Sequence, residues 1–217
     1  MKEVRSSMNK VQSEVRRLAA QLQDHAVYQE LRAGTLSLER YQLLLWVLRQ
    51  VHVGFETQAW DSRSDSVRRV CKQLTRKRPA LERDLVAACG KTLVVPRPVN
   101  EPLDGYLASL DKPTTPARIL GRLLFAEALL AGHAVPHSGF VSNAQLPDTA
   151  GDYLSRALDA DEFAEVCQLF AHGLVGEVPV NNAYQAAQAL RGALTAALDA
   201  VLRCAAQRRV NLEERSA

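Results

Sequence analysis

The sequence predicts an all-α fold, a single-domain multi-helical bundle, and two observations support that prediction. Apolar residues recur every three or four positions through most of the 217 residues, as they do along one face of an α-helix. No stretch of useful length alternates apolar and polar residues, as a half-buried strand does. Because a chain of this length can bury one sizeable core, we expect one domain over residues 1–217, with its core at about 10–205.

The N-terminal part of the chain is expected to form three helices. The first has an apolar stripe of four residues spaced three and four apart: Val11, Val15, Leu18 and Leu22. A short helical turn follows at residues 27–32 and ends at Gly34, since glycine is common just after a helix. Ser37 is a suitable N-terminal cap for a long helix over residues 38–60, because its hydroxyl can accept a hydrogen bond from the first turn.

Prolines and glycines mark the helix boundaries in the middle of the chain. Ser64 is a candidate cap for the next helix, and Pro79 suits the first turn of another helix that ends at Gly90. Three prolines within residues 92–102, together with the lack of an apolar stripe, predict an extended loop there. A short helix is expected at residues 103–110, before two further prolines interrupt the pattern.

The stretch RILGRLLFAEALLAGHAV, residues 118–135, indicates a buried central helix with small residues at intervals. These small residues are Gly121, Ala126, Ala128, Ala131 and Gly132. Glycine costs roughly 1 kcal/mol relative to alanine inside a helix. A glycine kept there therefore usually lets a backbone, a helix or a flat ligand approach closely. Pro136 ends this helix.

Helical patterns resume after a polar connection at residues 137–148. Two shorter helices are expected at residues 150–158 and 161–174, and a long alanine-rich helix at about 182–208. The long helix carries leucines every four residues, and the short tail that follows it is expected to fray.

Composition narrows the classes of function. A formal net charge of +3 is too small to indicate nucleic-acid binding by itself. No apolar run approaches 18 residues and the N-terminus lacks an apolar signal segment, so neither a membrane span nor a secretory signal is expected. The four cysteines lie far apart in the sequence: Cys71, Cys89, Cys167 and Cys204. Because their spacing suits neither a zinc site nor a disulfide scaffold, we expect reduced cysteines and a cytoplasmic location.

Five blocks resemble, in order, the pattern of the heme oxygenase-like superfamily. They are GTLSLERYQLLLWVLRQVHVGFE at residues 34–56, ALERDLVAACG at 80–90, GYLASL at 105–110, ARILGRLLFAEALLAGH at 117–133 and NNAYQAAQALRGALTAALDAVL at 181–202. The resemblance is to bacterial biliverdin-producing heme oxygenases and covers roughly residues 10–205. It implies that heme binds between the first helix and the central helix. The resemblance further implies that dioxygen and an electron donor open the bound heme macrocycle, which gives biliverdin, iron and carbon monoxide.

The resemblance also implies roles for individual residues, although the chain diverges from the family at the heme-contact positions. His25 is the implied axial ligand of the heme iron, and it lies six residues later than the family's histidine. The helix over the other heme face would contribute four positions: Gly121, Ala128, Gly132 and His133. The family has glycine where this chain has Ala128 and His133. The implied partners of the heme propionates are Arg16, Arg17 and Arg191.

Three other functions are compatible with the same fold. The changes at the heme-contact positions fit a binding or regulatory protein that does not turn heme over. A non-heme iron enzyme is the second alternative, because His52 and Glu56 lie four residues apart on one helical face. Further metal ligands would come from other helices: Glu127, Asp161, Glu165 and His172. A thiaminase-II-like enzyme would instead use an activated cysteine, for which Cys167 is the candidate.

A run of basic residues points to a protein partner. Six lysines and arginines fall between Arg68 and Arg78, and such a face suits an acidic electron-donor protein. Aromatic residues are not interleaved with these positive charges, so single-stranded nucleic acid is not the expected partner.

Overall fold

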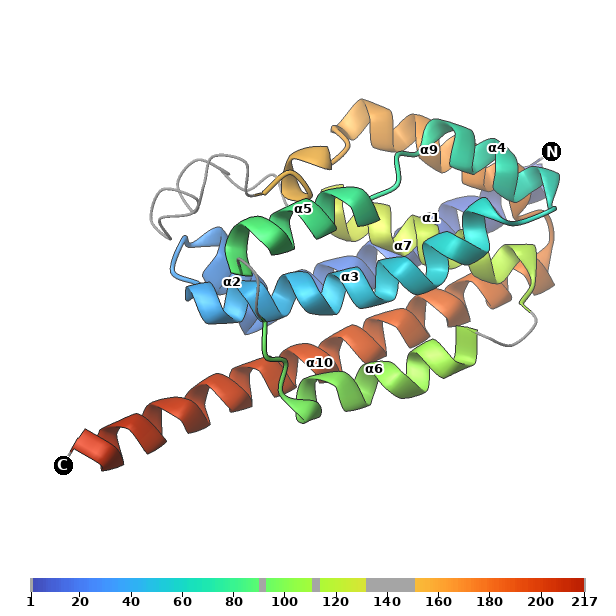
Figure 1. The fold of residues 1–217 in the computed structure, drawn as a ribbon. Helices are drawn as coiled ribbons and strands as arrows, with labels where there is room; N and C mark the ends of the chain where they lie inside the picture. Colours follow the sequence, from blue (N-terminus) through green and yellow to red (C-terminus); the bar gives the residue numbers. More distant parts are fainter. Residues whose placement is uncertain (1, 90–92, 111–113, 132–150, 217) are drawn as a thin grey trace.

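The computed structural model describes residues 2–89, 93–110, 114–131 and 151–216, which form α-helices joined by connections (Figure 1). The helices are α1 (Lys2–Gln23), α2 (Ala26–Arg32), α3 (Leu38–Trp60), α4 (Asp65–Gln73), α5 (Arg78–Cys89), α6 (Arg97–Leu110), α7 (Pro116–Ala131), the short 3-10 helix η1 (Leu154–Arg156), α9 (Ala160–Gly173) and α10 (Glu177–Ser216). No strand occurs in these parts of the chain, so the all-α prediction is confirmed for them.

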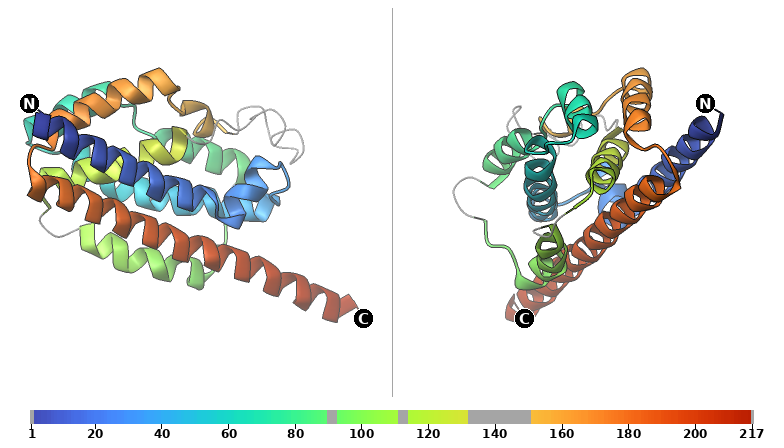
Figure 2. Two further views of the ribbon diagram at one scale, coloured as in Figure 1. Left: turned by 180° about the vertical axis from the view of Figure 1, so that it is seen from behind. Right: turned by 90° about the vertical axis from the view of Figure 1, so that its right-hand side faces the viewer.

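The longest helix, α10, runs along the whole bundle, and its C-terminal end extends beyond the other helices (Figures 1 and 2). It packs against α1, α3, α6 and α7. Helices α4 and α9 pack against each other on the side of the bundle away from α6. Helix α1 contacts α7, α9 and α10, so the first helix and the central helix are neighbours.

Helix α7 is the central helix of the bundle. All side chains from Ile119 to Leu130 are buried, including those of Arg122 and Glu127. The helix contacts α1, α3, α4, α9 and α10. The prediction of a buried central helix is therefore confirmed for the part of it that the structure describes.

The glycine inside α7 is explained by a close approach of two helices. A Cβ atom placed on Gly121 would stand 2.6 Å from the Cα and carbonyl carbon of Ala183 on α10, and closer still to the carbonyl oxygen. Real Cβ atoms essentially never come within 3.0 Å of a heavy atom from another part of the chain. Gly121 therefore lets the backbone of α10 approach closely, and a backbone was one of the neighbours expected from the sequence.

The serine caps differ in how they act. Ser37 stands at the N-cap of α3 as predicted, and its Oγ accepts a hydrogen bond from the Arg40 backbone N–H at 3.4 Å. Ser64 holds the N-cap position of α4, but its Oγ pairs with Ser66 Oγ at 2.9 Å and makes no capping bond.

The expected loop at residues 92–102 is wrong in its second half, because α6 begins at Arg97 and contains Pro102. Pro98 lies in the first turn, where a helix has no internal partner for its N–H groups. Pro102 removes one hydrogen bond inside the helix. Burial of four side chains offsets that loss, namely Val99, Leu103, Tyr106 and Leu110.

The tail is likewise helical in the structure. Helix α10 begins at Glu177, earlier than predicted, and continues to Ser216. The predicted leucine stripe is buried at Leu190, Leu194 and Leu198. Leucine, glutamate and arginine, which recur in the tail, all have high helix propensity and favour this continuation.

Candidate functional site

A cavity of about 620 Å³ lies between α1, α7 and the start of α9. Its lining residues come from three segments that are distant in sequence but adjacent in the fold: Arg16, Ala20 and Gln23 from α1, Ala128 and Ala131 from α7, and Leu158, Asp159, Ala160 and Phe163 at the start of α9. The volume falls within the range of ligand-binding pockets, roughly 300–1,000 Å³.

Small side chains shape the two helical walls of the cavity. The small residue on α1 is Ala20. Those on α7 are Ala128 and Ala131, which lie one helical turn apart. Gln23 ties these walls together, because its amide donates a hydrogen bond to the Leu129 carbonyl at 2.9 Å. The two helices therefore touch beside the cavity, which lies against their small side chains.

The third wall adds an aromatic ring, which contacts a positive charge from α1. The Phe163 ring lies beneath the guanidinium of Arg16, which stands 4.9 Å from the ring centroid. Arg16 is exposed at the cavity, and its guanidinium also interacts with the Cys167 thiol. Asp159 caps α9 by accepting hydrogen bonds from the N–H groups of Asp161 and Glu162, so its carboxylate is already engaged.

His25 does not stand where an axial ligand of a cavity-bound heme would have to stand. It is the N-cap of α2, where its Nδ1 accepts a hydrogen bond from the Val27 N–H at 3.2 Å. Its Nε2 lies 3.1 Å from the Asp199 carboxylate on α10. Both ring nitrogens are therefore engaged outside the cavity, and the residues of the first helix that line it are Arg16, Ala20 and Gln23.

The expected contacts on the central helix divide into three cases. Ala128 lines the cavity, together with Ala131. Gly121 instead faces Ala183 of α10, where a ligand would meet backbone. Gly132 and His133 lie outside the described residues.

The three arginines implied as propionate partners are also separated by the fold. Arg16 lines the cavity. Arg17 pairs with Glu14 on the same helix and reaches the Tyr184 hydroxyl at 3.5 Å. Arg191 donates a hydrogen bond to the Gln21 side chain at 2.9 Å. Arg16 is thus the one of the three whose position suits an anionic ligand in the cavity.

Behind the α7 wall lies a second group of polar side chains, which we call the buried cluster. Its members are His52, Glu56, Lys77, Glu127 and Tyr153, each at most 4% exposed. Glu56 Oε1 is 3.0 Å from His52 Nδ1 and accepts the Lys77 backbone N–H at 2.7 Å. Tyr153 Oη is 3.3 Å from His52 Nε2.

Lys77 and Glu127 complete this cluster. The Lys77 ammonium is 3.3 Å from Glu127 Oε2, an ion pair whose angles are poor for a hydrogen bond, and it donates to the Arg156 carbonyl at 3.2 Å. Burial raises the pKa of Glu127, and the nearby Glu56 acts in the same direction, while Lys77 opposes both. Burial likewise raises the pKa of Tyr153 well above its ordinary value.

The buried cluster does not have the composition of a metal site. Glu56 is shared between His52 and two backbone N–H groups, and an ammonium already stands beside Glu127. Nowhere in the described parts of the chain do three histidine, cysteine, aspartate or glutamate side chains gather in a way that could hold a metal ion. The other proposed ligands, Asp161, Glu165 and His172, are exposed on α9, apart from this buried group.

Cys167 lies in an environment that disfavours a nucleophile. The side chain is buried, and burial raises the pKa of its thiol, although Arg16 acts against that shift. A reactive cysteine requires the opposite change, because the thiolate is the nucleophilic form.

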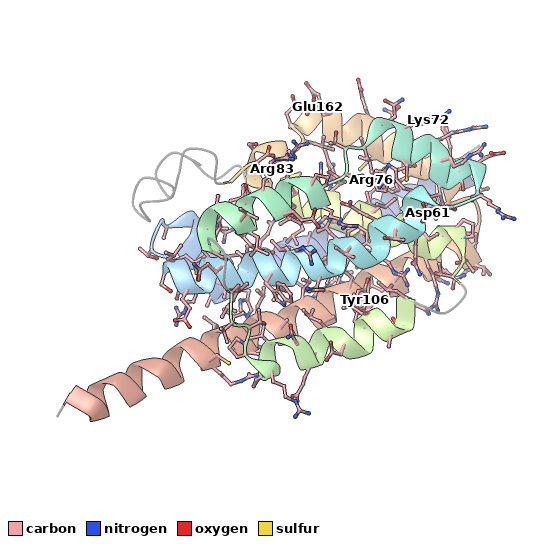
Figure 3. The ribbon with its side chains drawn as sticks, in the orientation of Figure 1. Asp61, Lys72, Arg76, Arg83, Tyr106 and Glu162 are labelled. Carbon is pink, nitrogen blue, oxygen red and sulfur yellow. The ribbon has the colours of Figure 1, made fainter. Side chains whose placement is uncertain are left out.

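The basic run does not form one positively charged surface. Lys77 points into the bundle, while Arg68 and Arg78 pair with acidic neighbours on their own helices. Arg76 lies over the Trp60 ring at 5.2 Å. Figure 3 shows Lys72 and Arg76 on the side of the bundle formed by α4 and α5. Together with Arg69, they are the exposed members of the run that could contact a partner.

Sequence reasoning missed several residues of both sites. Lys77 has the sequence context of a solvated basic run, and nothing in the chain marks it as buried. Tyr153 and the wall at residues 158–163 carry no motif either, because they are brought to α7 by tertiary packing alone. The family's histidine would fall at Ala19, which is buried in the core, whereas its neighbour Ala20 lines the cavity.

Among the helices that the structure describes, none is both long enough and apolar enough to cross a membrane. A scan against protein-family models and a search of curated proteins found no match to this chain, so the resemblance to heme oxygenases stays a prediction from its sequence blocks.

Proposed function

We propose that this chain binds heme, or another planar tetrapyrrole of similar size and charge, in the cavity between α1, α7 and α9. One observation carries the proposal. Two of the three walls of the cavity are the first helix and the central helix, the two segments that the heme oxygenase-like resemblance implies on either side of heme. The volume of the cavity lies within the range of ligand-binding pockets.

The chemistry of the lining supports a flat, apolar ligand with acidic groups at its edge. Ala20, Ala128 and Ala131 keep the helical walls low, while Leu158 and Phe163 provide apolar contact. Arg16 supplies a positive charge at the mouth of the cavity, and guanidinium groups pair well with carboxylates. These features suit the macrocycle and its propionates.

The described lining does not suit coordination of an iron atom. Its polar side chains are those of Arg16, Gln23 and Asp159, none of which is a usual axial ligand of heme iron. His25 is engaged at α2 and Asp199. The proposal is accordingly a binding protein of the heme oxygenase-like type, the alternative in which the macrocycle is held and is not opened.

The test is a titration of the purified protein with hemin and, in parallel, with metal-free protoporphyrin IX, followed by absorbance and by quenching of tryptophan fluorescence. We expect saturable binding of one equivalent of each ligand. Failure of both ligands to bind would overturn the proposal. Addition of a reductant and dioxygen to the hemin complex is expected to give no biliverdin, and its formation would establish turnover instead of binding alone.

A pair of matched variants locates the ligand. Ala20 lines the cavity and Ala108 lies on α6, away from it, and both alanines are exposed on helices. Ala20→Trp fills the cavity and is expected to abolish binding, whereas Ala108→Trp should bind as the unaltered protein does. Equal binding by the two variants would place the ligand elsewhere.

A further inference from the structure

The third wall of the cavity is held in place by contacts buried in the bundle. This wall, at residues 158–163, directly follows a stretch at 151–156 that is fixed at several points. The carboxylate of Asp84 on α5 accepts the backbone N–H groups of Asp152 at 2.8 Å and Tyr153 at 2.9 Å. Tyr153 also reaches His52 on α3 through its hydroxyl.

Lys77 connects this stretch to the opposite wall of the cavity. Its ammonium donates a hydrogen bond to the Arg156 carbonyl, two residues before Leu158, which lines the cavity. The same ammonium pairs with Glu127, whose neighbour Ala128 lines the cavity from α7. One buried cation thus spans the two segments whose separation defines the width of the cavity.

Stability alone gives little reason for this arrangement. An ammonium and a carboxylate lose their hydration when they are buried, and their attraction commonly does no more than offset that loss. Apolar residues of similar size would often serve a bundle core as well. What Lys77 adds is a link, because its ammonium holds the Arg156 carbonyl by a hydrogen bond and the Glu127 carboxylate by an ion pair.

We infer that Lys77 is a positioning residue of the cavity: by joining Arg156 to Glu127 it sets the spacing between the α7 wall and the wall at 158–163, and through that spacing it controls ligand affinity. This inference rests on the proposed tetrapyrrole site, but its first consequence, the order of the wall, is independent of any ligand. Lys77 itself does not touch the cavity.

The experiment compares Lys77→Met with Lys72→Met, a matched substitution of an exposed lysine on α4. Amide hydrogen exchange is measured over residues 151–163 without ligand. We expect exchange there to be at least about tenfold faster in Lys77→Met, because local opening becomes easier when a buried tie is removed. The Lys72→Met protein should exchange as the unaltered protein does.

Binding gives the second readout. If the competent wall is populated only about a tenth of the time in Lys77→Met, hemin and protoporphyrin IX bind about tenfold more weakly. The induced circular dichroism of the bound tetrapyrrole, which reports its orientation between the walls, should also change. Lys72→Met leaves both properties unaltered.

A further variant guards against a protein that does not fold, since Lys77→Met leaves Glu127 buried without its cation. The double substitution Lys77→Met with Glu127→Gln removes both charges and should fold, yet still show fast exchange at 151–163. Unchanged exchange in both variants, or fast exchange with unaltered affinity, overturns the inference. Absence of tetrapyrrole binding in the unaltered protein defeats the proposed function instead, and exchange then still decides whether Lys77 orders the wall.

Discussion

Gly121 on α7 lies directly against Ala183 on α10, with no room between them for a single additional carbon atom. We therefore expect Gly121→Ala to lower the free energy of unfolding by at least about 2 kcal/mol, because the obstacle is backbone and cannot rotate away. Urea denaturation measures the change. The matched control is Gly192→Ala on α10, where a Cβ meets nothing within 4 Å. That variant should be more stable by about 0.5–1 kcal/mol, and destabilisation of both variants alike would contradict this explanation.

The engagement of His25 predicts the behaviour of a His25→Ala variant. Since His25 caps α2 and contacts Asp199, its loss should lower the free energy of unfolding by about 1 kcal/mol. The absorbance band of bound hemin should stay unchanged, since the imidazole does not face the cavity. Loss of that band in a variant of undiminished stability would restore His25 as an iron ligand.

The lining of the cavity predicts that iron adds little to affinity. Hemin and protoporphyrin IX share a macrocycle and two propionates but differ in the metal. Because the described lining offers contacts to the macrocycle and a charge for the propionates, we expect dissociation constants within about tenfold of each other. A far tighter complex with hemin would reveal a ligand to the metal.

Arg16 and Arg17 form a natural pair for testing the role of charge, because they are adjacent, exposed arginines on α1. Only Arg16 lines the cavity. Arg16→Ala should weaken binding of protoporphyrin IX about fivefold, since an exposed ion pair contributes about 1 kcal/mol, and it should reduce the dependence of affinity on salt. Arg17→Ala should change neither quantity. The dimethyl ester of the porphyrin should bind to the Arg16→Ala protein and the unaltered protein equally.

The raised pKa of Glu127 predicts a pH-dependent contribution to stability of definite sign. The folded protein holds the Glu127 proton more tightly than the unfolded chain does, because burial disfavours the carboxylate. The contribution of Glu127 to the free energy of unfolding therefore falls as pH rises from about 4 through the folded pKa. The measurement is urea denaturation at several pH values for the unaltered protein and for Glu127→Gln, whose difference in stability should decrease with pH.

Glu82 supplies the opposite case. Its hydrogen bond with Arg78 is the largest influence and holds the pKa of Glu82 below its ordinary value. Its contribution is therefore present above pH about 4 and is lost as pH falls through the folded pKa. Differences of the same sign for Glu82→Gln and Glu127→Gln would contradict the assigned environments.

Local patterns predicted much of the fold. The spacing of apolar residues located the first, third and central helices, and the hydroxyl of Ser37 marked where α3 begins. The helix through Pro102 was missed, because burial of its apolar face against α3 and α10 outweighs the bond that proline removes. A sequence shows the missing N–H of a proline but not the packing that compensates for it.

The candidate site was predicted only in outline. The first and central helices were expected to face each other across a ligand, and they do line one cavity. Individual side chains were predicted less accurately, since His25, Gly121 and Arg191 do not line the cavity and contact other residues instead. Which way a side chain on a helix turns depends on where that helix sits in the bundle, and spacing along one chain does not specify it.

The burial of α7 on every side has a consequence for how the protein unfolds. No amide between Ile119 and Leu130 can reach water by fraying of α7 alone, since α1, α3, α4, α9 and α10 all pack against this helix. Exchange of these amides should therefore require unfolding of the whole bundle. The free energy of opening calculated from their exchange rates should equal the free energy of global unfolding. Hydrogen exchange in the central helix therefore reports whether the bundle unfolds cooperatively, because α7 opens only when the helices around it have separated.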